Sequence, residues 1–467
     1  MAMLVGGASA AVRDTISLNA GWQFHLGELA GIEAVKNAKS ERVNLPHDFL
    51  IGQPWVEPDA SERPDNSDAG SNVRSRLSPR GFKEMNVGWY RYVLTPKAEW
   101  KGRRVVLDFQ GIMLVGDVWL NGKHIGKTDY GYLGFDTDIS SILKYDGDNE
   151  IIVKANTQQP NNSRWYTGGG LYRDVNIIVT DKKLYFPRHP LFIRTENNKK
   201  VKIQAEIACF NKVDNIPAEV KIYDANGEVV AQKKQNIVFN GKWRTREYEL
   251  QTIEIDNANL WSCESPYLYT AEVTLFDNQG NVVDQIREQF GVRTIEFSPD
   301  FGFKLNGKKV LLKGYANHHT LGALGAAAYP RAIEKRIQLM KSFGYNHIRT
   351  SHNPYSEDFM RLCDRYGILV VDELYDKWLT QYAGGRVEWE ALWQRDVPEW
   401  VKRDRNHPCV VLWSLGNELQ QYPNLPFNDW GVTAYKLQRE LLHRYDNTRL
   451  TTVAMHPRYR DIDTDSI

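Results

Sequence analysis

The stretch Cys409–Glu418, CVVLWSLGNE, is a short apolar run that ends abruptly in Gly-Asn-Glu. A run of this kind is typical of a strand buried on both faces, as in a parallel sheet. In a barrel of parallel strands, catalytic groups collect at the carboxyl ends of the strands. We therefore predict a functional role, such as general acid, for Glu418; the alternative is an ordinary strand-end carboxylate.

The segments before and after this run alternate between strand and helix patterns. Strands are predicted over 310–315, 346–350, 368–373, 409–415 and 449–455, and helices over 332–342 and 357–366. Alternating elements with short connections predict right-handed βαβ units and a parallel sheet. Polar residues follow the strands at Asn317-His318-His319, Ser351-His352-Asn353, Asp372-Glu373 and Asn417-Glu418. That recurrence is typical of an active site at the carboxyl end of a (β/α)8 barrel.

The first 293 residues have a different pattern, with short alternating strands and turn signals such as Asn121-Gly122. We predict two all-β sandwich domains, over residues 14–181 and 182–293, followed by the barrel domain over 294–467. Residues 1–13 are a leader in which Ala8-Ser9-Ala10 fits the small-x-small cleavage pattern of secretory signals. We therefore expect an exported protein, periplasmic or extracellular; the alternative is an uninformative flexible leader.

Composition excludes several classes of function. Lys and Arg total 59 against 58 for Asp and Glu, so no basic excess indicates nucleic acid and no basic cluster indicates a membrane surface. The four cysteines are far apart, without CxxC spacing, which argues against a zinc site and a disulfide framework. The 14 Trp and 23 Tyr suit sugar binding, but aromatic residues serve more commonly in β-sandwich cores.

Two longer motifs resemble the hallmarks of glycoside hydrolase family 2. The first is 346–354, NHIRTSHNP, running on to 364–373, DRYGILVVDE; the second is 404–408, DRNHP, leading into 413–418, WSLGNE. The resemblance implies a jelly-roll domain, an immunoglobulin-like domain and a (β/α)8 barrel, in that order. Within the family, 313–319 (KGYANHH) and 321–325 (LGALG) are most similar to β-galactosidases.

The resemblance also implies roles for individual residues. Glu418 would be the general acid/base of a retaining hydrolase, and Asn417 would hydrogen-bond the sugar 2-hydroxyl. His318 and His352 would line the sugar pocket, and Arg349 would brace the carboxylates; for each histidine the alternative is a structural strand-end residue.

Other residues are expected near the pocket without reacting themselves. Asn162 and Arg164 lie in a loop that the family sends towards the substrate. Asp372, Glu373 and Trp413 are expected to support the site from outside the sugar contact; for both carboxylates a purely structural role is the alternative.

Two departures from the family pattern affect the expected chemistry. Magnesium-dependent members use a Glu and a His just beyond the third barrel strand, where this chain reads Leu374-Tyr375-Asp376-Lys377, so we predict no metal and no other cofactor. From Ile295 onward the chain has room for about five barrel strands. We therefore expect a barrel that is truncated, a nucleophilic Glu beyond the chain end, and very poor hydrolysis by the 467-residue chain alone.

Three functions remain open at this point. The first is a retaining exo-β-galactosidase acting on a β-galactoside oligosaccharide or polysaccharide. The second is another family 2 specificity, such as β-glucuronidase, and the third is a catalytically inactive carbohydrate-binding protein. A homo-oligomer is also open, because family 2 enzymes are often oligomeric.

Overall fold

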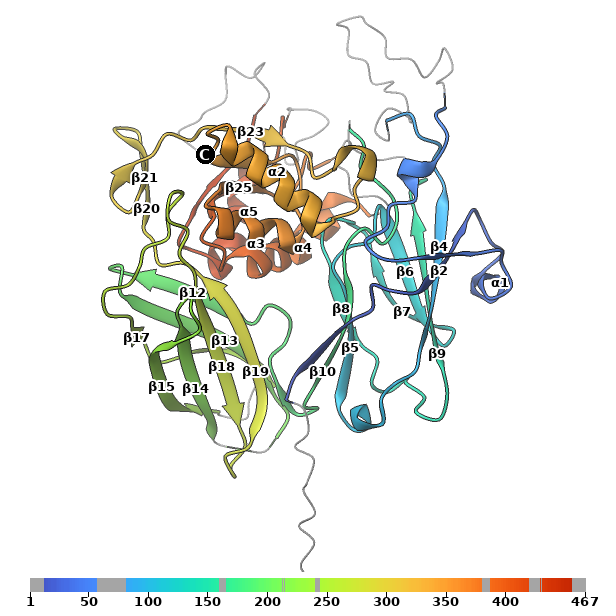
Figure 1. The fold of residues 1–467 in the computed structure, drawn as a ribbon, viewed down its shortest axis with the longest axis horizontal. Coiled ribbons are helices and arrows are strands. Elements are labelled where there is room, and N and C mark those ends of the chain that lie inside the picture. The colour runs from blue at the N-terminus through green and yellow to red at the C-terminus, as the bar shows by residue number, and fades with distance from the viewer. Residues whose placement is uncertain are drawn as a thin grey trace, which may run out of the picture.

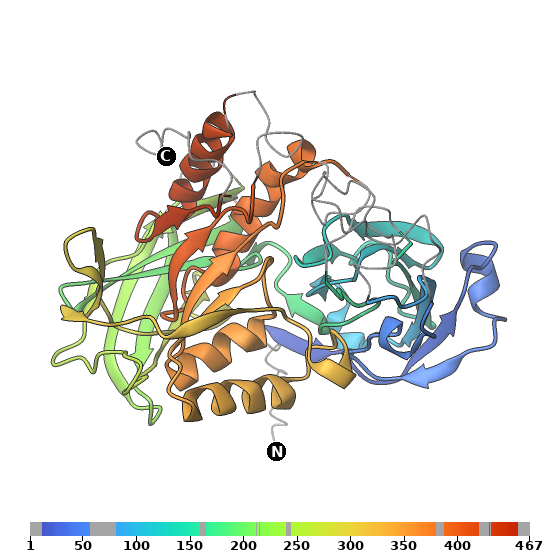
Figure 2. The same ribbon diagram turned by 90° about the horizontal axis from the view of Figure 1, so that it is seen from above.

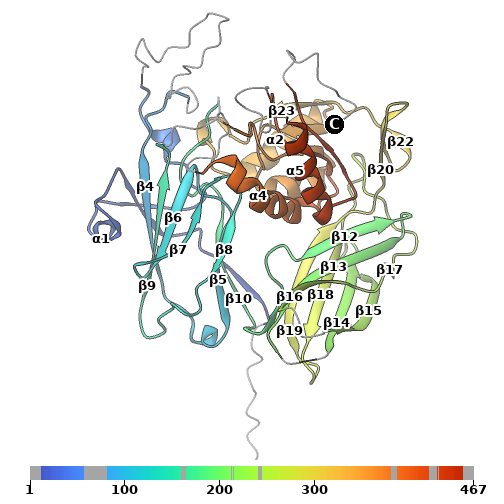
Figure 3. The same cartoon turned by 180° about the vertical axis from the view of Figure 1, so that it is seen from behind.

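The computed structural model describes residues 12–56, 81–158, 165–211, 213, 215–239, 244–379, 387–419, 429 and 431–455. These residues form two antiparallel β-sandwiches and a parallel sheet covered by helices (Figure 1). The two sandwiches lie below and beside the helical part, and both contact it (Figures 1 and 3). None of the helices in the described part of the chain combines the length and apolar composition needed to cross a membrane.

The first sandwich packs a four-stranded sheet, β1-β10-β5-β8, against a six-stranded sheet, β3-β2-β4-β9-β6-β7. Alternate side chains of β10, Val175, Ile177 and Val179, are buried between the sheets because side chains alternate along a strand. The strands are β1 (Asp14–Ser17), β2 (Trp22–Leu26), β3 (Glu41–Val43), β4 (Val87–Leu94), β5 (Arg104–Phe109), β6 (Val115–Leu120), β7 (Lys123–Thr128), β8 (Phe135–Asp138), β9 (Asn149–Asn156) and β10 (Val175–Thr180), with short helices α1 (Ile32–Val35), η1 (Leu50–Gly52) and η3 (Ala98–Trp100).

The second sandwich is smaller and also antiparallel. One sheet contains β11-β13-β12, with β16 and β17 pairing with β13, and the other has the order β15-β14-β18-β19. The strands are β11 (Leu184–Tyr185), β12 (Leu191–Glu196), β13 (Lys200–Cys209), β14 (Asn215–Tyr223), β15 (Val229–Val238), β16 (Thr245–Glu249), β17 (Ile253–Glu254), β18 (Tyr269–Phe276) and β19 (Val282–Phe290).

The third part begins with a small antiparallel sheet and continues as five parallel strands in the order β23-β24-β25-β26-β27. A helix follows each of the strands β23, β24, β25 and β26, and neighbouring helices pack in chain order (Figure 2). The elements are β20 (Ile295–Ser298), β21 (Gly302–Leu305), β22 (Lys308–Lys309), β23 (Gly314–Asn317), η4 (Gly322–Leu324), α2 (Pro330–Ser342), β24 (His347–Thr350), α3 (Glu357–Tyr366), β25 (Leu369–Glu373), α4 (Trp389–Asp404), β26 (Val410–Ser414), α5 (Val432–Tyr445) and β27 (Leu450–Thr452).

Local sequence accounts for the helix boundaries that lead into the site. Helix α3 starts after Ser356, whose hydroxyl accepts a hydrogen bond from the Phe359 amide at 3.3 Å. It ends at Gly367, which has φ 67°, a left-handed conformation that glycine adopts without a Cβ penalty. The chain then enters β25 directly, so the carboxyl end of β25 has a defined position.

The fold class expected from the sequence is confirmed, with one local correction. The strand predicted over 310–315 is wrong in its position: Lys308–Lys309 belongs to the small antiparallel sheet, and the first parallel strand covers only Gly314–Asn317. The apolar pair Leu311-Leu312 suggested a strand, but the main chain there connects two sheets instead. Helices α4 and α5 had no specific sequence prediction.

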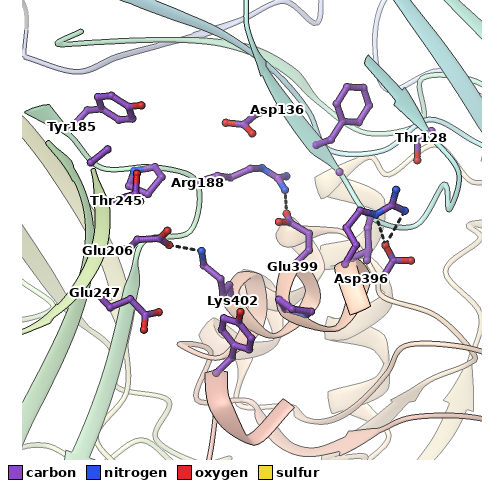
Figure 4. A pocket seen from close by; sticks show the side chains of 18 of the residues that line it. Thr128, Asp136, Tyr185, Arg188, Glu206, Thr245, Glu247, Asp396, Glu399 and Lys402 are labelled. Carbon is purple, nitrogen blue, oxygen red and sulfur yellow. Dashed lines mark hydrogen bonds and ion pairs between the residues drawn. The ribbon is translucent and has the colours of Figure 1, made fainter. Parts of the chain in front are cut away.

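A cleft of about 730 Å³ lies where the two sandwiches meet helix α4 (Figure 4). Ion pairs cross it between domains. Arg188 donates to Asp108 of the first sandwich at 2.9 Å and also pairs with Glu399 of α4. Lys402 of α4 pairs with Glu206 of the second sandwich. These pairs join its walls, so we assign the cleft a structural role; it contains none of the predicted site residues.

Replacing Arg188 by Met should destabilise the assembly of the three parts. Asp108 is buried, and burial raises the pKa of its carboxyl while the Arg188 charge opposes that rise. Without Arg188, two carboxylates lose their shared partner, and we expect the free energy of unfolding to fall by up to about 3 kcal/mol. Differential scanning calorimetry measures this loss of stability as a lower melting temperature. Arg331→Met is the control, because the Arg331 side chain is 94% exposed and its ion pair contributes little. Equal melting of both variants would contradict the assignment.

Candidate active site

Glu373, the last residue of β25, is the centre of a polar cluster at the carboxyl end of the parallel sheet. It has no exposed surface. One carboxylate oxygen accepts a hydrogen bond from His352 Nδ1 at 2.6 Å. The other accepts from Arg349 Nη2 at 2.6 Å and from Ser414 Oγ at 2.5 Å. The three donors come from β24, from the residues that follow it and from β26, so the cluster holds adjacent strands together.

Arg349 connects this cluster to Asn417. Its Nη2 atom also donates to Asn417 Oδ1, at 2.9 Å. The Asn417 side-chain nitrogen donates in turn to Asp376 Oδ1, at 2.9 Å. Asn417 is 3% exposed, and both ends of its amide are oriented by charged neighbours. The amide therefore has one defined orientation at the carboxyl end of the parallel sheet.

Glu418 follows Asn417 and is the most exposed acidic group of the cluster. Its side chain is 53% exposed, whereas Glu373 is fully buried. Its main chain has φ 45°, a left-handed conformation that is uncommon for a residue with a Cβ. The buried Lys377 ammonium lies 3.7 Å from Glu418 Oε2. Glu418 therefore has a side chain that a ligand can reach and a main chain with a defined conformation. A group that transfers protons to a bound ligand requires both.

An aromatic wall faces these polar groups, and part of it comes from the first sandwich. The ring of Trp165 stacks on His318, with centroids 4.4 Å apart and an interplanar angle of 23°. Trp165 also meets His352 edge-on at 5.2 Å. His318 Nδ1 donates to the Ser351 carbonyl at 3.0 Å, which fixes that ring. Two histidines from the parallel sheet and a tryptophan from another domain thus form one surface.

Asp48 of the first sandwich fastens the segment that carries Trp165. Its buried carboxylate accepts hydrogen bonds from Tyr166 Oη at 2.7 Å and from the Gly169 amide at 2.9 Å. It also accepts from the Ala326 amide of the barrel part, at 2.7 Å. Burial raises the pKa of Asp48, and these hydrogen bonds oppose the rise. Asp48 therefore fixes the Trp165 segment against the barrel.

Two of the residues expected to support the site face away from it. Asp372 accepts a hydrogen bond from Trp400 Nε1 at 2.6 Å. Burial, and to a smaller extent the negative charge of the nearby Asp404, raises the pKa of Asp372 well above the usual value. Trp413 donates to Asp446 at 2.9 Å and packs edge-on against Trp400 at 4.7 Å. Both side chains point into the helix layer, since neighbouring residues of a strand face opposite sides. Their neighbours along the strands, Glu373 and Ser414, face the site instead.

The remaining predicted residues divide into two groups. Arg349, His318, His352, Asn417 and Glu418 lie in the cluster, brought together from three strand ends. Asn162 and Arg164 lie outside the described residues, although Trp165 next to them is described and contacts the cluster. His319 is buried against Tyr132 and Tyr172, and burial lowers its pKa to about 3, so it belongs to the domain interface.

Ser414, Asp376 and Lys377 are site residues that the sequence analysis did not assign. Their positions directly after or within barrel strands were the available signal. That signal could not be used residue by residue, because it does not tell which of two adjacent side chains faces the pocket.

Three family models match consecutive parts of the chain. The Glycosyl hydrolase 2 galactose-binding domain-like model matches residues 82–172, Glycosyl hydrolases family 2 matches 189–293, and the family 2 TIM barrel domain matches 299–465. The chain belongs to glycoside hydrolase family 2. The recognition made from the two sequence motifs is thereby confirmed, and the barrel model covers every parallel strand described above.

Individual family 2 relatives carry two different activity names. A β-galactosidase of Bacteroides ovatus is 32% identical over 429 residues, covering 87% of this chain and 47% of the relative. A β-glucuronidase of Bacteroides fragilis is 27% identical, covering 95% of this chain and 61% of the relative. A solved family 2 structure from Bacteroides cellulosilyticus is 33% identical with a TM-score of 0.83, covering 94% of this chain and 56% of that one. The chain thus spans about half to three fifths of these relatives.

Proposed function

We propose that this chain provides the sugar pocket and the general acid/base of a retaining β-galactosidase, with Glu418 as the acid/base. The observation that carries the proposal is the Asn417-Glu418 pair at the end of β26. Asn417 is held by Arg349, and Glu418 stands half exposed beside it. In this mechanism Glu418 protonates the departing glycosidic oxygen and later removes a proton from the attacking water.

Glu373 has a different role in this proposal. Both of its oxygens accept hydrogen bonds from Arg349, His352 and Ser414, and it has no exposed surface. We therefore assign Glu373 to orienting the Arg349 and Asn417 side chains rather than to attacking the sugar. The retaining mechanism requires a second carboxylate as nucleophile, which we propose lies outside the described residues.

The wall of Trp165, His318 and His352 supports a sugar as the ligand. Aromatic rings pack on the apolar C–H face of a sugar, while the polar groups opposite hydrogen-bond its hydroxyls. The β-galactosidase relatives and the similarity of Lys313–Gly325 to β-galactosidases favour a galactoside. β-Glucuronidase is the second candidate, because a β-glucuronidase relative matches 95% of the chain.

Release of nitrophenol tests the proposal. The protein expressed from its natural gene is assayed with nitrophenyl β-galactoside and nitrophenyl β-glucuronide, and Glu418→Gln serves as the blank. We expect release from the galactoside above the blank and faster than from the glucuronide. Faster release from the glucuronide would favour the second candidate. No release from a folded sample would contradict both and favour a sugar-binding protein, which calorimetry with galactose then tests.

Trp165→Ala is expected to weaken substrate binding across the domain boundary. Loss of the stacked ring removes a sugar-facing surface and the support of His318, worth about 1.4 kcal/mol, so KM should rise about tenfold. We expect kcat to change by less than about threefold, because no proton-transfer group is lost. Steady-state kinetics measure both constants. Trp55→Ala is the control, since Trp55 is 73% exposed. An unchanged KM would show that Trp165 does not contribute to the pocket.

A further inference from the structure

Lys377 is a buried cation next to the proposed acid/base. Its side chain is 2% exposed, and it follows β25 by four residues. The ammonium donates to the Asn417 carbonyl at 2.7 Å and to Asp376 Oδ1 at 3.1 Å. It lies 3.7 Å from Glu418 Oε2. The Lys377 charge is therefore surrounded by one carbonyl and two carboxylates, all at the carboxyl end of the parallel sheet.

These three oxygens would also suit a divalent cation. Carboxylate and carbonyl oxygens are the ligands that magnesium and calcium prefer, but such ions need several of them together. Among the described residues, no group of three or more His, Cys, Asp and Glu side chains could hold a metal. The space between Asp376 and Glu418 is taken by the Lys377 ammonium instead. The described residues therefore do not fit a metal at this position.

We propose that the Lys377 ammonium supplies, just beyond the third parallel strand, the positive charge that magnesium would supply there in the metal-dependent pattern. Lys377 is then a positioning residue that acts through Glu418. This inference rests on the proposed function, since it takes Glu418 as the proton-transferring group. It also explains how two neighbouring strand ends keep the Asp376 and Glu418 carboxylates around one point without a metal.

Lys377 fixes Glu418 in two ways. Its hydrogen bond to the Asn417 carbonyl holds the peptide that enters the left-handed conformation of Glu418. Its charge attracts the Glu418 carboxylate, whose Oε2 lies 3.7 Å from the ammonium, and so restricts where that carboxylate can lie. Asp376 closes the arrangement, because it binds both Lys377 and the Asn417 side chain.

The first test is kinetic and uses the protein expressed from its natural gene. Wild-type hydrolysis of nitrophenyl β-galactoside should be unchanged by EDTA and by added Mg²⁺. Lys377→Met keeps the length of the side chain and removes its charge. We expect kcat to fall at least tenfold, because Glu418 loses the cation that positions it. Lys377→Arg, which keeps the charge, should restore most of the wild-type kcat.

Lys341→Met is the matched control for this test. The Lys341 ammonium also donates to main-chain carbonyls, those of Cys263 and Tyr366, but it lies at the end of α2 that leads into the start of β24. Lys341→Met should leave both kcat and the metal independence unchanged. Loss of wild-type activity in EDTA that Mg²⁺ restores, or a kcat of Lys377→Met that matches the wild type, would overturn the proposal.

The second test does not need activity. Mn²⁺ uptake is followed by electron paramagnetic resonance in the wild type, in Lys377→Ala and in the double variant Lys377→Ala/Glu418→Gln. We expect Lys377→Ala to gain one Mn²⁺ site that the wild type lacks, and the double variant to lose it. Equal uptake by all three would overturn the proposal. If the wild type hydrolyses no glycoside, the proposed function fails, and the Mn²⁺ result still decides whether Lys377 takes the place of a cation.

Discussion

Glu418→Gln is expected to lower kcat/KM for a natural β-galactoside by about 10³-fold, because general acid–base catalysis typically contributes about 10²–10⁴-fold. Gln has the same shape as Glu but can neither donate a proton to the leaving oxygen nor remove one from water. Circular dichroism and melting should stay near wild-type values, since the Glu418 side chain is 53% exposed and buries little on folding.

The loss should depend on the leaving group in a way that identifies the role of Glu418. A dinitrophenyl galactoside has a leaving group that departs without protonation, so the first step should be nearly unaffected. Added azide, which attacks without a base, should then restore turnover and yield a galactosyl azide. Glu390→Gln, an exposed carboxylate in the first turn of α4, is the control. An equal loss for natural and dinitrophenyl substrates would argue against a proton-transfer role.

Glu373→Gln is expected to reduce both activity and stability, in contrast to Glu418→Gln. The substitution keeps the volume and removes a buried charge that binds Arg349 and His352, each at 2.6 Å. Breaking a buried ion pair on one side typically costs about 3–5 kcal/mol. Arg349 also orients Asn417, so the pocket loses its alignment as well, and kcat should fall by about 10²-fold.

Calorimetry and kinetics on the same samples separate these two effects. The melting transition of the barrel part should shift to lower temperature in Glu373→Gln and stay unchanged in Glu418→Gln. Ser414→Ala is a graded comparison, because it removes one neutral donor to Glu373 and should cost about 1 kcal/mol. A Glu373→Gln variant that melts like the wild type would contradict the central position of this residue. Loss of stability with full activity would restrict Glu373 to a structural role.

Much of the fold followed from local patterns in the sequence. The apolar run ending in Gly-Asn-Glu predicted the β26 strand, and the alternation after Arg293 predicted parallel βαβ units. These predictions succeed because strand and helix periodicities reflect hydrogen bonding within a segment and burial of one or both faces. The motifs around Arg349, His352 and Glu418 also located the candidate site, since the carboxyl ends of parallel strands meet at one edge.

The sequence could not decide which side chain of each strand-end pair faces the pocket. Asp372 and Glu373 are chemically alike neighbours, and the hydrogen bonds that Asp372 accepts from Trp400 and Thr350 are among the contacts that leave Glu373 facing the site. Trp413 and Ser414 are a second such pair. Strand geometry requires that neighbours face opposite sides, but the absolute choice depends on what covers each side of the sheet.

Contacts between distant segments were likewise decided only by the tertiary structure. Trp165 reaches His318 from another domain, and Lys377 meets Glu418 across two strand ends. The residue types, the parallel βαβ units and the family were determined by the sequence alone. The identity of the organising carboxylate, the aromatic wall and the buried cation depended on non-local packing, because no periodicity within one segment encodes a contact with another.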